Sequence, residues 1–205
     1  MDIKDRLARI KFVNIKPDLG TLAEAEREAL RHSVNAARIM SDIYLRQVHP
    51  KNAEIYAELK KRDDPEGKIL KQYFEVHGSP WDGYVGDEPG VPGVGPKPKF
   101  GAFYPENFTK EEFRSWLAAH PDDAEQFESN YTVIKRERGR LTAVPYTKEY
   151  APFLEEAADE LRKAAALLPN GNLRTFLEAR AAAFGSNAFF ESEFAWVDTD
   201  GYPFE

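Results

Sequence analysis

Apolar residues recur every three to four positions along most of this chain, which is the spacing of amphipathic helices. This spacing predicts helices over residues 21–49, 52–62, 65–76, 109–120, 121–129, 147–168 and 172–184. Thr21 with Glu24, and Thr109 with Glu112, have the spacing of a helix capping box. The turn between the last two helices is so tight that they should form an αα-hairpin. The pattern therefore predicts a mainly helical, multi-helix domain.

Three other segments have patterns that are compatible with strands. The segments 131–134 and 141–144 flank Arg138-Gly139, which predicts one small β-hairpin. Between Ile10 and Ile15 apolar and polar residues alternate with a shift, so this stretch is either a short strand or the tail of an N-terminal helix. The pattern does not separate these two alternatives.

A long loop interrupts the helices between Gly78 and Phe100. Its 23 residues include six glycines and five prolines, too many for a helix interior or a central strand. Trp81, Asp82 and Tyr84 combine aromatic faces with a carboxylate, as substrate-binding clefts do. Large aromatic residues in loops also anchor the loop to the core, and both interpretations of these three residues stay open.

The segment from Phe189 to Trp196 is rich in aromatic residues and carboxylates. Phe190, Phe194 and Val197 are spaced as one face of a helix. We expect this face to pack in the core.

Length and composition limit the class of protein. The 205 residues suit a single domain over 1–205, and 42% hydrophobic residues are enough for a folded core. A net charge of −7 disfavours a nucleic-acid partner. The sequence contains no cysteine, and its apolar runs are too short for a membrane span. We expect a cytoplasmic protein without a membrane or nucleic-acid partner.

The sequence offers no catalytic or metal-binding motif. None of its four histidines begins a His-Glu-x-x-His motif, so the usual helical zinc site is absent. Glu28 and His32 lie one helical turn apart, which predicts an ordinary surface pair. No nucleophile or general base can be assigned from spacing, and we therefore assign neither catalytic residues nor metal ligands.

Several strings together resemble the N-terminal half of bacterial proteins related to dipeptidyl peptidase III. They include Pro80-Trp81-Asp82-Gly83-Tyr84, Gly86-Asp87-Glu88-Pro89, Phe103-Tyr104-Pro105, Thr109-Lys110-Glu111-Glu112-Phe113, Val144-Pro145-Tyr146-Thr147-Lys148-Glu149-Tyr150 and Ala195-Trp196. Members of this family are zinc metallopeptidases that remove dipeptides from short peptides, with a His-Glu-x-x-x-His helix among their zinc ligands. That motif does not occur here.

The resemblance thus implies a non-catalytic N-terminal portion that forms part of the substrate cleft, with zinc bound elsewhere in the full-length protein. Its implied partners are the catalytic lobe of the same protein and short peptides, and Trp81, Asp82 and Tyr84 would face the peptide. The alternatives are a stand-alone protein-interaction domain, or a small enzyme with a non-metal mechanism.

Overall fold

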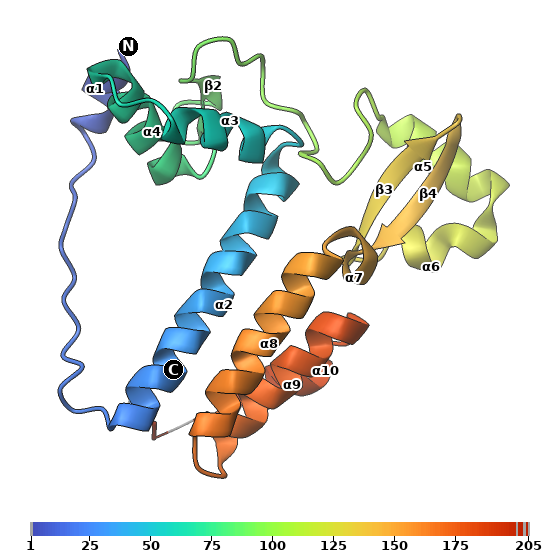
Figure 1. Cartoon of the computed structure of the whole chain (residues 1–205). Helices are drawn as coiled ribbons and strands as arrows, with labels where there is room; N and C mark the ends of the chain where they lie inside the picture. The colour runs from blue at the N-terminus through green and yellow to red at the C-terminus, as the bar shows by residue number, and fades with distance from the viewer. Residues whose placement is uncertain (1, 200, 203, 205) are drawn as a thin grey trace. The chain divides into compact units, whose positions relative to one another are not determined.

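The computed structural model describes residues 2–199, 201–202 and 204 (Figure 1). The chain divides into two compact units. The first contains the residues up to Ile15 together with Tyr44–Ala119, and the second contains Lys16–Ile43 together with the residues from His120 onward. The expectation of a single domain over 1–205 stays a prediction. The expectation of a mainly helical fold with one small β-hairpin is confirmed.

The first unit is built from short helices and the Gly/Pro-rich loop. Its elements are α1 (Ile3–Leu7), the last turn of α2 (Glu24–Val48), α3 (Asn52–Lys60), α4 (Pro65–His77), β1 (Trp81–Asp82), β2 (Glu88–Pro89) and α5 (Lys110–Ala119). Leu59, Leu70 and Phe74 form its core, and Val91 from the loop joins them. The loop is thereby packed as part of the unit.

Local sequence sets the ends of α4. The Asp64 carboxylate accepts a hydrogen bond from Gly67 N at 2.9 Å, and Pro65 occupies the first helical position, where it needs no amide hydrogen. Gly78 ends the helix in the left-handed region at φ 60°, which costs glycine little. The Gly/Pro-rich loop therefore begins directly at this cap.

Neither sequence-based alternative for Ile10–Ile15 is correct. The N-terminal helix α1 ends at Leu7, and residues 11–15 form no regular structure. Phe12, Val13 and Ile15 are exposed. Alternation alone does not make a strand, because among the described residues no second strand pairs with this segment.

The second unit contains the first and middle turns of α2 and the remaining elements. These are a 3₁₀-helix (Pro121–Asp123), α6 (Ala124–Phe127), β3 (Thr132–Glu137), β4 (Arg140–Pro145), α7 (Tyr146–Glu149), α8 (Ala151–Leu167), α9 (Asn172–Ser186) and α10 (Phe190–Val197). Ala157, Ala164 and Ala181 are fully buried in its core. Small side chains at these positions let the helices approach closely.

The two predicted hairpins are confirmed. β3 and β4 pair antiparallel with Glu137 opposite Arg140, so Arg138 and Gly139 form a two-residue turn, and both have positive φ. The αα-hairpin of α8 and α9 is closed by residues 168–171. Figure 1 shows α9 returning antiparallel beside α8.

Three helix predictions need correction. α2 begins at Glu24 and not at Thr21. The Glu26 carboxylate accepts a hydrogen bond from Ala23 N, so the side chain that caps the start of the helix is Glu26 and not Glu24. The helix predicted over 147–168 is divided at Tyr150 into α7 and α8, because Pro152 is compatible only with the first turn of a new helix. The apolar face of α10 is exposed instead of buried.

Candidate functional site

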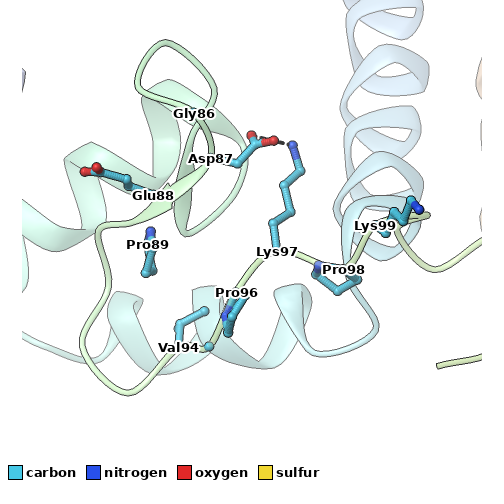
Figure 2. Close-up of a pocket in the computed structure, with 10 residues that line it drawn as sticks. Gly86, Asp87, Glu88, Pro89, Val94, Pro96, Lys97, Pro98 and Lys99 are labelled. Carbon is cyan, nitrogen blue, oxygen red and sulfur yellow. Dashed lines mark hydrogen bonds and ion pairs between the residues drawn. The ribbon is translucent and has the colours of Figure 1, made fainter. Parts of the chain in front are cut away.

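A shallow groove of about 690 Å³ lies along the Gly/Pro-rich loop of the first unit (Figure 2). It is lined by Gly86, Asp87, Glu88, Pro89, Val94, Gly95, Pro96, Lys97, Pro98 and Lys99. The three prolines restrict the backbone of the lining. The groove is therefore a candidate site whose walls are held in shape without long secondary structure.

Both signs of charge line this groove. Lys97 Nζ lies 2.8 Å from Asp87 Oδ1, and Figure 2 shows this ion pair across the groove. Lys99 Nζ lies 5.4 Å from the centre of the Phe100 ring, and it forms no ion pair with a carboxylate of the described residues. Glu88, by contrast, is paired with Arg6. The groove thus offers the ammonium group of Lys99 to an anion, whereas its two carboxylates already pair with Lys97 and Arg6.

The buried side chain of Trp81 anchors this loop. Its side chain is 1% exposed, and its indole Nε1 donates a hydrogen bond to the main-chain oxygen of Gly95 at 2.9 Å. Its ring meets the His49 ring edge to face, with centroids 5.1 Å apart. Trp81 therefore connects the two ends of the loop to the core, which is the anchoring role that the sequence left open.

Asp82 organises the turn that follows Trp81. Its Oδ1 accepts a hydrogen bond from Tyr84 N at 2.9 Å, and its main-chain oxygen accepts one from Asp87 N at 2.8 Å. The residue is only 3% exposed. The buried carboxylate and the main-chain oxygen of Asp82 each accept a main-chain N–H, which fixes the backbone near the groove because an unmade bond would be costly.

A buried charged cluster surrounds the other oxygen of Asp82. Asp82 Oδ2 lies 3.7 Å from Arg6 Nη1 and 3.9 Å from His77 Nε2. Arg6 also pairs with Glu88 of the groove wall. Sequence analysis missed Arg6 and His77, because a contact between α1 and residues more than 70 positions away leaves no local pattern.

Burial sets the protonation of this cluster. Desolvation lowers the pKa of His77; the negative charge of Asp82 opposes this shift and the positive charge of Arg6 adds to it. Desolvation likewise raises the pKa of Tyr73, whose ring lies 4.6 Å from the His77 ring. The surroundings of His77 thus favour its neutral form.

Tyr84 differs from its two predicted companions. Its side chain is 88% exposed, and its ring centre lies 6.0 Å from that of His77. The structure therefore separates the three predicted residues: Tyr84 is open to a ligand, while Trp81 and Asp82 lie beneath the surface. Substrate binding by these residues stays a prediction.

Outside this loop, Glu28 and His32 lie 3.5 Å apart, but His32 Nδ1 has a closer partner in Glu160 at 2.8 Å. The expected surface pair is therefore part of a link between α2 and α8.

Within the described part of the chain, no group of three or more His, Cys, Asp or Glu residues is arranged to hold a metal ion. In the same part, every helix is too short or too polar to cross a membrane.

Comparisons with known proteins find two similar solved structures and one similar curated protein. A scan against protein-family models finds no match. Two solved structures match 97% of the chain, both of bacterial dipeptidyl peptidase III. The one from Caldithrix abyssi is 40% identical with a TM-score of 0.92, and the one from Corallococcus sp. strain EGB is 36% identical with a TM-score of 0.90. The resemblance predicted from the sequence is confirmed.

The chain corresponds to only part of these proteins. It spans 38% of the Caldithrix chain and 37% of the Corallococcus chain, which is consistent with an N-terminal portion. A curated relative, Nudix hydrolase 3 of Arabidopsis thaliana, is 28% identical over 98% of this chain and 32% of its own length. The matched proteins are named as two different kinds of hydrolase, so neither activity is assigned to this chain by similarity alone.

Proposed function

We propose that this chain is a non-catalytic portion of a dipeptidyl peptidase III-like zinc peptidase and forms one wall of its peptide cleft. The match to most of this chain, but to less than two fifths of each solved peptidase, carries the proposal. The chain has no His-Glu-x-x-x-His motif. In this proposal zinc and the attacking water belong to a catalytic lobe of the same polypeptide outside these residues, and the protein is cytoplasmic.

The groove of residues 86–99 supports a peptide ligand. A short peptide carries a carboxylate at one of its ends, and the groove presents the ammonium group of Lys99 to it. In the proposed complex Lys99 pairs with a peptide carboxylate, and the exposed ring of Tyr84 packs against a peptide side chain. Trp81 and Asp82 act indirectly, because they hold the loop in place.

A binding titration tests this proposal on the 205-residue chain. A tetrapeptide added to the chain should shift NMR signals of the loop, and Lys99→Ala should weaken binding about two- to fivefold, the size expected for one exposed ion pair. Tyr84→Ala should weaken it by a similar or larger factor. Lys68→Ala, an exposed lysine of α4, is the matched control and should leave the affinity unchanged.

The same titration can refute the groove as the binding surface. If Lys99→Ala and Tyr84→Ala bind the peptide as tightly as the unchanged chain, the peptide does not use this groove. If Lys68→Ala weakens binding equally, the effect is one of net charge rather than of a defined site.

The second candidate function is a stand-alone domain that binds another protein. The exposed face of Phe190, Phe194 and Val197 favours it, since exposed apolar faces mark interaction surfaces. The gene sequence downstream of the codon for Glu205 separates the two functions. Continuation into a His-Glu-containing helix supports the peptidase portion, and a stop codon supports the free-standing domain.

A further inference from the structure

Helix α10 exposes its large apolar side chains, whereas an ordinary surface helix buries them. Phe190, Phe194 and Val197 lie within an arc of about 60° at 100° per residue, and they are 69%, 60% and 75% exposed. Ser192, on the opposite side, is fully buried, and its hydroxyl donates a hydrogen bond to Phe189 O at 2.8 Å. The helix therefore buries a small polar residue and exposes its large apolar ones.

This face is held rigidly by its own unit. Asn172 Nδ2 donates a hydrogen bond to Asp198 O at 2.6 Å, directly after the last turn of α10. Arg180 of α9 pairs with Glu193 at 2.7 Å. Contacts on α9 thus hold both the middle and the end of α10, which Figure 1 shows beside α9. The exposed side chains belong to a fixed surface and not to a frayed end.

The chemistry of the face favours an apolar partner with basic residues at its edge. The rings of Phe190 and Phe194 lie 4.7 Å apart and form one aromatic surface, and Trp196 is also half exposed. Two carboxylates, those of Glu191 and Asp198, are exposed near this surface. A partner that covers it must bury aromatic side chains and match negative charge at the rim.

We propose that this apolar face of α10 is the docking surface for the catalytic lobe of the same polypeptide. The inference rests on the proposed function, because the greater part of each matched peptidase chain lies outside the region that this chain covers. A tethered lobe is present at high effective concentration, so contacts with only three or four large side chains are enough to keep it docked on this face. The covering segment is apolar and carries Lys or Arg residues at its edge.

Thiol labelling tests the docking directly, because the sequence contains no cysteine. Val197→Cys places one thiol on the face and leaves both phenylalanines in place. Glu155→Cys places a control thiol on an exposed position of α8 in the same unit. Each variant is made both in the 205-residue chain and in the longer polypeptide that the proposed function requires, and its rate of reaction with a maleimide is measured.

In the 205-residue chain we expect both thiols to react at similar rates. In the longer polypeptide the Val197→Cys thiol should react at least tenfold more slowly, and the Glu155→Cys thiol at an unchanged rate. Adding Phe190→Ser and Phe194→Ser to the longer polypeptide should restore fast labelling of the Val197→Cys thiol. Equal rates for this thiol in both polypeptides would overturn the docking proposal.

The other outcomes separate the two proposals. If the longer polypeptide releases dipeptides but leaves the Val197→Cys thiol open, the proposed function stands and the docking surface is wrong. If the thiol is protected in the 205-residue chain with a concentration dependence that matches dimer formation in sedimentation, a second copy covers the face and docking to the lobe is refuted. If the reading frame stops at Glu205, the proposed function and the docking both fail.

Discussion

Glu160 of α8 links two helices of the second unit and offers a quantitative test of the structure. Its carboxylate accepts hydrogen bonds from Lys163 Nζ at 2.6 Å, from His32 Nδ1 at 2.8 Å and from Asn35 Nδ2 at 2.9 Å. These three bonds lower the pKa of Glu160 to about 2 from an ordinary value of 4.5. Two of the three partners lie on α2, so the charged form of Glu160 stabilises the contact between α2 and α8.

The size of the effect follows from the pKa shift. A shift of this size corresponds to at most about 3–4 kcal/mol, at roughly 1.4 kcal/mol per pKa unit. The hydrogen bond from Lys163 contributes most to the shift, and its side chain is 57% exposed, so solvent screens this contribution. We therefore expect Glu160→Gln to lower the free energy of unfolding at pH 7 by about 1–2 kcal/mol.

The pH dependence gives the sign of the effect. Because folding lowers the pKa of Glu160, its stabilisation is fully present above about pH 4.5 and is lost as the pH falls to about 2. Urea unfolding of the unchanged chain and of Glu160→Gln should differ at pH 7, and the difference should disappear toward pH 2. Glu156→Gln, exposed on the same helix, should leave the unfolding free energy within about 0.5 kcal/mol.

Two results would refute this reasoning. A Glu160→Gln chain as stable as the unchanged chain at pH 7 would mean that the three bonds contribute no net stability. A destabilisation that persists at pH 2 would mean that the loss comes from packing rather than from the charge.

Two further predictions concern the loop and its buried cluster. Gly90→Ala would place a Cβ 2.2 Å from Cε1 of the fully buried Tyr73. It should lower the free energy of unfolding, measured in urea, by about 1–3 kcal/mol. Gly83→Ala has open space at its Cβ and should leave that free energy unchanged. Because burial lowers the pKa of His77, the unfolded chain binds its proton more readily, and stability should fall as the pH drops below about 6.5. In His77→Gln this slope should be shallower between pH 7.5 and 5, and equal slopes would contradict the assignment.

Local chemistry made several elements predictable. Thr109 Oγ1 accepts a hydrogen bond from Glu112 N at 3.0 Å, as the capping-box spacing required. Arg138 and Gly139 adopt positive φ because a two-residue hairpin needs it. Each of these features depends on residues within a few positions of one another, so a single sequence contains the necessary information.

The features that sequence analysis missed depend on distant residues. The pairing of Arg6 with Asp82 and Glu88 joins segments separated by more than 70 positions. Periodicity correctly placed Phe190 and Phe194 on one face of a helix, but it cannot say whether anything in the chain covers that face. Composition likewise could not distinguish the buried Trp81 from the exposed Tyr84, since both are aromatic residues of one loop.

The most direct test of the central proposal is zinc-dependent release of dipeptides from a short peptide. The assay compares the purified 205-residue chain with the longer polypeptide that the proposed function requires, each supplied with zinc. We predict turnover by the longer polypeptide and none above background by the 205-residue chain. Robust zinc-dependent turnover by the 205-residue chain alone would contradict the proposal that it is a non-catalytic portion of such a peptidase.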